Sequence, residues 1–102
     1  MRKITKLASI AFWAGKSFSL DNTTVKVSSD KIEMYLHGNL IARKDLTGLY
    51  VTDAGWKTGT TKERINRILS NIGKSVYQKK GEWFFQDGTI FPPRCIIKVI
   101  KY

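Results

Sequence analysis

The side chains best able to do chemistry in this sequence are basic ones around one predicted helix and the hairpin after it. Arg64 and Arg67 fall together on a helical wheel beside the apolar stripe, and Lys57 lies just before the helix. Lys79 and Lys80 lie at the tip of the predicted hairpin. Basic side chains contact nucleic-acid phosphates, and amides at a helix start add further donors. The spacing therefore predicts a phosphate-binding surface formed by helix and hairpin.

Aromatic side chains lie among these charges and would allow base stacking. Tyr35 and Tyr50 lie on predicted strands, where exposed rings would form a stacking platform. Trp83 and Phe85 are expected in the core, because a small domain needs large apolar side chains inside. Tyr77 follows an apolar residue in an alternating pattern, so it is the better candidate for an exposed stacking ring.

Two further basic clusters extend the candidate surface. Arg43 and Lys44 end a predicted strand, and a third cluster near the N-terminus contains Arg2, Lys3 and Lys6. If all of these clusters share one face, they form a single footprint for a polyanion. If they are dispersed, the surface is basic all over without a defined binding site. The sequence is compatible with both arrangements.

The overall charge points to an acidic partner. Eighteen Lys and Arg residues oppose eight Asp and Glu, which gives a formal net charge of +10 in 102 residues. Such a field attracts phosphates and speeds encounter with polyanions. The expected partners are DNA, RNA or an acidic host protein surface.

Catalytic and metal-binding patterns are not found in the sequence, so we expect neither an enzyme nor a cofactor. His37 is the only histidine and Cys95 the only cysteine. No phosphate-loop or dinucleotide fingerprint is present. Cys95 sits in an apolar run and is expected to be buried. Asp45 and Asp53 would make a carboxylate pair across the predicted strands, but a solvated loop role is favoured for both.

The first segment is predicted to be a helix that ends near Gly15. Its apolar face follows helical spacing through Ile4, Leu7, Ala8 and Ala11, with Phe18 a further candidate. The alternative is a signal peptide, but the apolar run is short and broken. Trp13 is expected to pack under a neighbouring loop and not to stack on a base. No segment approaches the length of a membrane span.

Alternating apolar and polar residues predict four antiparallel strands between residues 23 and 52. Gly38 and Asn39 give the signal of a two-residue hairpin turn, and His37 is assigned to the same turn. Thr47 and Gly48 mark the next turn.

A helix over residues 61–72 is the clearest predicted element. Thr60 and Glu63 fit a capping box, in which each side chain bonds the backbone amide of the other residue. Gly73 is the expected left-handed residue at the end. We expect Trp56, just before the helix, to pack and fix the entry of the chain. The predicted apolar stripe consists of Ile65, Ile68, Leu69 and Ile72.

A hairpin over residues 76–85 and a final strand complete the pattern. Pro92 and Pro93 interrupt pairing before the last strand, which is apolar on both faces and is expected to be central or covered. The sequence therefore predicts one α+β domain over residues 1–102. It contains a mostly antiparallel sheet (a four-strand meander, a hairpin and the final strand) packed with two helices.

Three segments carry a resemblance to a known group. They are "HGNLIA" (37–42), "AGWKTGTTKERIN" (54–66) and "VYQKKGEWFF" (76–85). Together they resemble a family of small proteins of tailed bacteriophages, over roughly residues 20–86. Members end in a short Asn-Gly-x-x-Trp-Asp-Gly tail, whereas this chain continues into a longer strand. The resemblance implies a phage-encoded protein that acts in the bacterial cytoplasm, and it implies no particular activity.

Two functional hypotheses follow from these observations. The first is an accessory protein that binds nucleic acid through the backbone, using Lys57, Arg64, Arg67, Tyr77, Lys79 and Lys80, with Arg43 and Lys44 as a further cluster. The second is a host-takeover or anti-defence inhibitor that binds a host protein or ribonucleoprotein complex. Neither hypothesis involves a membrane, and the oligomeric state is left open by the sequence.

Overall fold

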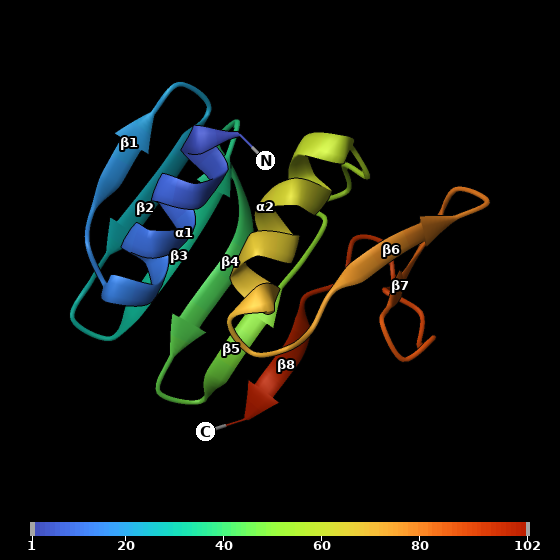
Figure 1. The fold of residues 1–102 in the computed structure, drawn as a ribbon. Helices are drawn as coiled ribbons and strands as arrows, with labels where there is room; N and C mark the ends of the chain where they lie inside the picture. Colours follow the sequence, from blue (N-terminus) through green and yellow to red (C-terminus); the bar gives the residue numbers. More distant parts are fainter. Residues whose placement is uncertain (1, 102) are drawn as a thin grey trace.

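The computed structural model describes residues 2–101, which form two helices, a six-stranded sheet and a separate two-stranded sheet. Helices α1 (Lys3–Ala14) and α2 (Gly59–Ser70) lie on the same face of the larger sheet (Figure 1). The opposite face carries no helix from the described residues. Neither of the described helices is long and apolar enough to cross a membrane. The α+β class predicted from the element order is confirmed.

The larger sheet is antiparallel throughout, with strand order β1-β2-β3-β4-β5-β8. The predicted meander corresponds to β2–β5 and is confirmed, while the short first strand was not predicted. The strands are β1 (Phe18–Leu20), β2 (Thr23–Val27), β3 (Lys31–Leu36), β4 (Asn39–Asp45), β5 (Gly48–Val51) and β8 (Ile97–Lys101).

The turn between β3 and β4 is shifted by one residue from the prediction. Its two residues are His37 and Gly38, with left-handed φ values of 51° and 79°. Positive φ at both positions is the geometry of a type I′ hairpin turn, whose twist matches the flanking strands. Asn39 belongs to β4 and pairs with Leu36. The shift leaves the His37 side chain exposed at the end of the sheet.

The face that α1 buries overlaps the predicted one, because Ala8 and Ala11 are buried as expected, but it is rotated toward Phe12. Leu7 is 37% exposed, although the apolar spacing placed it in the core. Phe12 is fully buried, and small or hydroxyl side chains occupy the rest of the same face. The bulk of Phe12 accounts for the rotation, because burying an aromatic ring removes more apolar surface from water than burying a leucine. The buried residues are Thr5, Ala8, Ser9, Ala11 and Phe12.

The end of α1 follows the prediction. Gly15 is left-handed at φ 70° and terminates the helix, while Phe18 belongs to β1 and not to the helical face. Trp13 packs inside the protein as expected, but against α2 and not under a loop, because its indole Nε1 donates to the Ile68 carbonyl at 3.2 Å. The Lys44 ammonium lies 5.0 Å from the centre of the same indole.

Helix α2 begins two residues before the predicted start and has a different cap. The Thr58 backbone is extended, and its hydroxyl accepts from the Thr61 amide at 3.1 Å. The predicted capping box is wrong, because Thr60 lies within the first turn and Glu63 points toward α1. The predicted apolar stripe is confirmed for Ile65, Ile68 and Leu69, which are fully buried, and for Ile72, which packs partly buried against the core.

The smaller sheet pairs β6 (Val76–Lys79) with β7 (Glu82–Phe85) and projects away from the larger sheet (Figure 1). Lys80 and Gly81 form its turn, with left-handed φ values of 52° and 79°. Trp83 anchors the hairpin to the rest of the protein. Its side chain is fully buried, and its ring centre lies 5.5 Å from that of Phe91. Gly73 is left-handed at φ 72°, as predicted, although α2 itself ends at Ser70.

Of the predictions about the last segment, the central position of the strand and the burial of Cys95 are wrong, whereas the strand's cover by the core is confirmed in part. Strand β8 pairs only with β5, so it is an edge strand and not a central one. Cys95 is exposed and not buried, because it lies in the segment before β8 begins at Ile97. Side chains of β8 contribute to the core from the edge, where Ile97, Val99 and Ile100 pack partly buried against it.

The position of the α2 cap gives a stability test. Thr58→Ala removes the hydroxyl that satisfies the Thr61 amide, and we expect the free energy of unfolding to fall by about 1 kcal/mol. Thr60→Ala removes no cap and should change stability by less than about 0.5 kcal/mol. Urea unfolding of both variants measures the difference. A larger loss for Thr60→Ala would support the capping box instead.

Candidate functional site

Arg64, the central predicted phosphate contact, is buried. Only 1% of its surface is exposed, and its guanidinium is used inside the protein. Nε donates to the Thr23 hydroxyl at 3.1 Å, Nη2 to the Asn22 side chain at 3.4 Å, and Nη1 to the Thr5 hydroxyl. These partners come from α1 and from the start of β2. Arg64 is therefore removed from the candidate binding surface, because its donors already have partners.

Glu63 completes this buried cluster. Its carboxylate accepts from the Thr5 hydroxyl, lies 3.3 Å from Arg64 Nη1 and pairs with Arg2 at 3.4 Å. Burial alone would raise the pKa of Glu63, but the bond from Thr5 and the charge of Arg2 outweigh it, and the pKa lies below its ordinary value. Glu63 therefore joins the two helices and does not cap its own helix.

The other predicted contacts on α2 and the hairpin remain accessible. Lys79 and Lys80 are exposed at the hairpin tip, and Arg67 is half-buried in the last turn of α2. Tyr77 is 43% exposed, as predicted, and stacks on Phe84 with ring centres 5.6 Å apart.

Two hydrogen-bonded contacts tie the hairpin to α2. Lys62 Nζ donates to the Gln78 side chain at 3.4 Å. The Asn66 amide bonds both backbone groups of Val76, at 2.9 and 2.6 Å. The structure thus joins helix and hairpin as the sequence predicted, but without Arg64.

Arg43 and Lys44 do not form one cluster, because neighbouring strand residues point to opposite faces. Lys44 faces the helices and donates to the Trp13 carbonyl at 3.3 Å. Arg43 faces the other way, where its guanidinium lies 4.7 Å from the centre of the Tyr50 ring. It also pairs with Asp45 at 3.2 Å.

The helix-free face of the sheet carries a rung of charged and aromatic side chains. We call it the sheet rung, and its residues are cross-strand partners in the order Lys26, Glu33, Arg43, Tyr50 and Lys98. Lys98 approaches the Tyr50 ring to 5.3 Å, so two cations flank that ring. Lys26 lies 4.9 Å from the ring of Tyr35, which is also on this face. Three cations and two tyrosines therefore share one surface.

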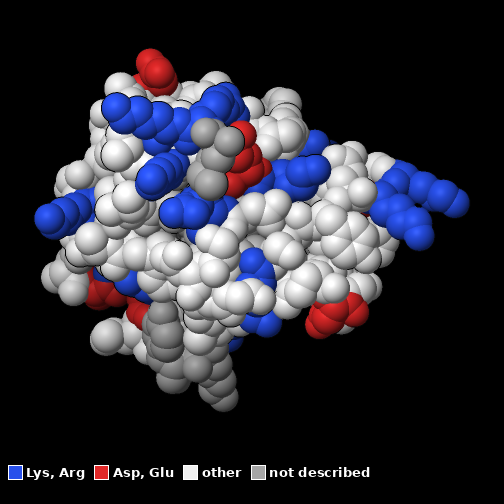
Figure 2. Space-filling model, in the orientation of Figure 1, with Lys and Arg blue, Asp and Glu red and all other residues white. Residues whose placement is uncertain are grey.

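Few of the cations are neutralised within the protein. Among the described side chains, only Arg2, Arg43 and Arg64 form an ion pair with a carboxylate. Figure 2 shows Lys and Arg side chains over much of the face that carries the helices, from the region of α1 to the end of the hairpin, with fewer acidic side chains. The positive charge is spread over both faces of the sheet and is not gathered into one footprint.

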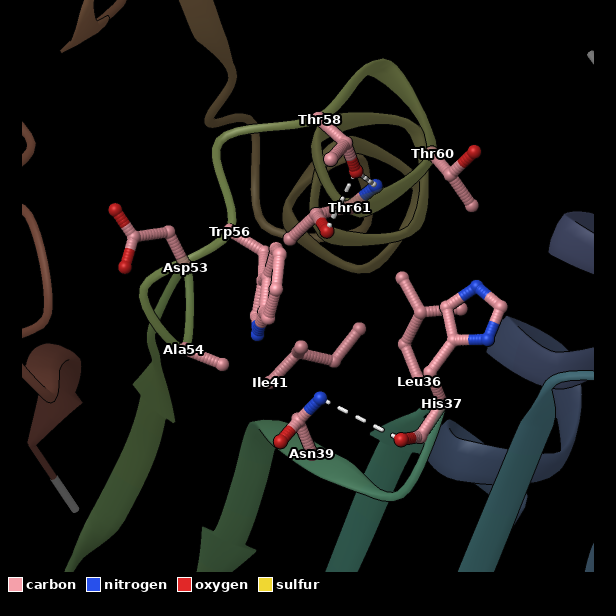
Figure 3. A pocket seen from close by; sticks show the side chains of 10 residues that line it. All are labelled: Leu36, His37, Asn39, Ile41, Asp53, Ala54, Trp56, Thr58, Thr60 and Thr61. Atoms are coloured by element: carbon pink, nitrogen blue, oxygen red, sulfur yellow. Dashed lines mark hydrogen bonds between the residues drawn. The ribbon is translucent and has the colours of Figure 1, made fainter.

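A hollow of about 410 Å³ lies where two of the three segments that carry the family resemblance meet. Residues 36–41 of the β3–β4 turn line one side, and residues 53–61 of the loop and first turn of α2 line the other. The indole of Trp56 and the imidazole of His37 stand on opposite sides of this hollow, with Ile41 between them (Figure 3). Side chains of Thr58, Thr60 and Asn39 also border it. We call this the Trp56 hollow.

Trp56 contradicts the expectation that it only packs. It is 61% exposed, whereas Trp83 is fully buried. It also borders a second, shallow hollow of about 470 Å³, shared with Ala54, Gly55 and Arg94. An exposed indole between two hollows is a contact surface and not a core residue. Sequence reasoning missed it because the glycines and threonines around it have adequate explanations as turn and cap residues.

The loop that carries Trp56 is held by a buried aspartate. Asp53 is fully buried, although a solvated role was expected for it. Its Oδ1 accepts from the amides of Gly55 at 2.8 Å and Arg94 at 2.9 Å, and its carbonyl accepts from the Trp56 amide at 2.8 Å. The carboxylate points away from the Trp56 hollow (Figure 3). Asp53 is thus a structural residue that fastens two loops.

Backbone strain is concentrated around Trp56. Three of the described non-glycine residues with left-handed φ lie there, namely His37 (51°), Ala54 (57°) and Arg94 (59°). Such conformations cost free energy and persist where surrounding contacts hold them, which is common at functional sites.

The buried position of Arg64 gives a stability test. Arg64→Ala leaves a cavity between α1, α2 and β2 and removes the donors that satisfy the Thr23 hydroxyl and the Asn22 side chain, so we expect the free energy of unfolding to fall by about 3 kcal/mol. Arg67→Ala, one turn further along α2, removes an equal charge and should cost about 0.5 kcal/mol or less. Denaturant unfolding of both variants provides the comparison. Equal losses would contradict the internal role of Arg64.

The lowered pKa of Glu63 makes stability depend on pH. The ordinary pKa of glutamate is about 4.3. Below that pH, Glu63 is protonated in the unfolded chain but remains ionised in the folded protein. Acid therefore lowers the free energy of unfolding, and this loss is completed as the pH falls through the folded pKa. Glu63→Gln should show a flatter decline between neutral and acidic pH, measured by denaturant titrations. An unchanged pH profile would show that Glu63 is not the responsible group.

Comparison with known proteins identifies a family. The family model described as Kyanoviridae Gp96 protein matches residues 1–94. No curated protein and no solved structure matches the chain. The family match supports the phage origin that the three sequence segments implied and extends beyond the range that they covered. The chain belongs to the Kyanoviridae Gp96 protein family.

Proposed function

We propose that this phage protein binds nucleic acid through the phosphate backbone, with little sequence readout, as an accessory factor in the cytoplasm of the infected bacterium. The observation that carries the proposal is the uncompensated charge. The chain has a formal net charge of +10, and among the described side chains only three cations are paired with carboxylates. Unpaired cations on a surface release counterions when they meet phosphates, which is the main source of sequence-independent affinity.

The sheet rung is the surface best suited to a single strand. It places Lys26, Arg43 and Lys98 beside the rings of Tyr35 and Tyr50 on a face without helices. Proteins that bind single strands combine cations along the backbone path with aromatic rings near the bases. Two cations already lie over Tyr50, so we assign this rung chiefly to phosphate contact.

The hairpin offers a second surface of the same kind. Its outer face carries Tyr77, and its tip carries Lys79 and Lys80. Arg67 on α2 and Lys57 before that helix are further candidates. A helix that reads a duplex groove is not favoured, because Arg64 and the apolar stripe of α2 are committed to the interior.

A second candidate function is the inhibitor of a host protein or ribonucleoprotein complex. The observation that favours it is on α1, where Leu7 and Ile10 are 37% and 52% exposed. Apolar side chains one turn apart on a helix present a face for docking to another protein. Binding that resists high salt and depends on Leu7 and Ile10 would favour this function over the first.

Fluorescence anisotropy of the purified protein against labelled single-stranded DNA, duplex DNA and RNA tests the proposal. We expect saturable binding whose log K falls steeply and linearly with log salt, because neutralised phosphates release counterions. The exposed ring of Tyr77 predicts tighter binding to a single strand than to a duplex. Failure to bind all three ligands at low salt would contradict nucleic-acid binding.

Two double variants with equal loss of charge locate the surface. Arg43→Gln/Lys98→Gln alters the sheet rung, and Lys79→Gln/Lys80→Gln alters the hairpin tip. The loss of two single-strand phosphate contacts should reduce the salt slope by about 1.4. We expect this change for the first variant and a smaller one for the second. A larger change in salt slope for the hairpin variant would place binding on the hairpin. Equal changes would indicate that the positive charge acts diffusely and that neither surface is a specific site.

A further inference from the structure

The indole of Trp56 is open on both sides. It is 61% exposed, and it borders both the Trp56 hollow, of about 410 Å³, and the second hollow, of about 470 Å³. An indole left in water forgoes the stabilisation that burial of so large an apolar surface provides. Its position between two hollows leaves room for a flat ligand against the ring.

The opposite wall of the Trp56 hollow is polar at the rim and apolar at the floor. Ile41 and Leu36 form apolar surface beneath, while His37 faces Trp56 across the hollow (Figure 3). The Asn39 side chain reaches the same space, and its NH₂ group makes a long bond of 3.4 Å to the His37 carbonyl. A side-chain amide can donate to and accept from the edge of a heteroaromatic ring. A volume of about 410 Å³ lies within the usual range for ligand pockets.

Cations surround the hollow but do not fill it. Arg2 reaches its rim by donating from Nη2 to the Thr60 hydroxyl at 3.0 Å. Lys57 follows Trp56 in the chain, and Arg94 lines the second hollow on the far side of the indole. Positive charge on both sides of an aromatic ring matches a base whose own nucleotide and neighbours carry phosphates.

The backbone on either side of Trp56 is held in place by hydrogen bonds. The buried carboxylate of Asp53 bonds the amides of Gly55 and Arg94, and the Thr52 hydroxyl accepts from the Ala54 amide at 3.1 Å. The Thr58 amide donates to the Trp56 carbonyl at 2.9 Å, immediately before the cap of α2. A loop backbone fixed in this way loses little conformational entropy on binding.

From this geometry we infer that the Trp56 hollow is a binding site for an unpaired nucleobase, stacked on the indole with Asn39 at its polar edge. The inference rests on the proposed nucleic-acid binding and adds a base-contacting site to a backbone-directed surface. It accounts for two of the three segments that carry the resemblance, which meet at the hollow although they are separated in the chain. The ligand class is a single strand, because a paired base cannot enter a hollow of this kind without leaving its duplex.

The test compares two labelled single strands of equal length, one with all bases present and one in which abasic sites replace most bases. Both keep the backbone charge, so their difference reports base contact. We expect the wild-type protein to bind the complete strand about tenfold more tightly. Trp56→Leu should abolish this preference, whereas Trp56→Phe, which keeps a ring, should retain most of it. In addition, adenosine 5′-monophosphate should quench tryptophan emission of the wild type and not of Trp56→Leu.

Tyr77→Leu tests the competing stacking ring on the hairpin, because Tyr77 is also exposed but is already stacked on Phe84. It should reduce the preference for the complete strand far less than Trp56→Leu does. Leu46→Ala is the control, because Leu46 is 85% exposed and lies on no surface assigned to nucleic acid, and it should keep the preference. Thermal unfolding checks that each variant folds. Asn39→Ala is a second change in the hollow that leaves Trp56 intact, and it should also weaken the preference for the complete strand.

The outcomes separate the two proposals. If the wild type binds neither strand at low salt, the proposed function itself fails. If it binds both strands equally, or if Tyr77→Leu and not Trp56→Leu removes the preference, the base site is wrong while backbone binding stands. If Trp56→Leu weakens both strands alike, Trp56 acts in folding or charge placement and not in base contact.

Discussion

The buried guanidinium of Arg64 is the constraint on which the arrangement of helices and sheet depends. It bonds hydroxyls from α1 and β2, and it lies beside the carboxylate of the neighbouring Glu63. A buried charge that lost these partners would cost several kcal/mol, so α1, α2 and the start of β2 must keep their relative positions. The loop that carries Trp56 runs directly into α2, so this cluster positions the end of the loop, while Asp53 fastens its start.

Elements defined by periodicity could be predicted from the sequence. The meander, the apolar stripe of α2 and the hairpin around Lys80 all follow from local spacing and turn chemistry, and the structure confirms them. Where two neighbouring residues gave the same local signal, the sequence could not choose between them. Thr58 and Thr60 are both competent caps, and the choice between them depends on Glu63, which is drawn toward Thr5 by tertiary contact. No local pattern contains that information.

The candidate site depends on contacts between distant segments, and this explains what the sequence did not reveal. A helical wheel placed Arg64 beside the apolar stripe but carried no information on the depth of the groove that receives it. The sheet rung requires the register of four strand pairs, and the Trp56 hollow requires the β3–β4 turn to meet the start of α2. Conversely, the exposure of Tyr77 followed from simple alternation with Val76, because both lie on one strand with one buried side.

The alternation of side chains across the larger sheet also affects how the protein can change over evolutionary time. In β3 and β4, residues packed under the helices alternate with residues on the helix-free face, except at the irregularity near Tyr35. Substitutions at Lys26, Glu33 or Arg43 alter the character of that face without disturbing the packing beneath it. Family members can therefore diverge in the charge and shape of this surface while they conserve the same interior, so sequence variation is expected to be greater along the rung than around Arg64.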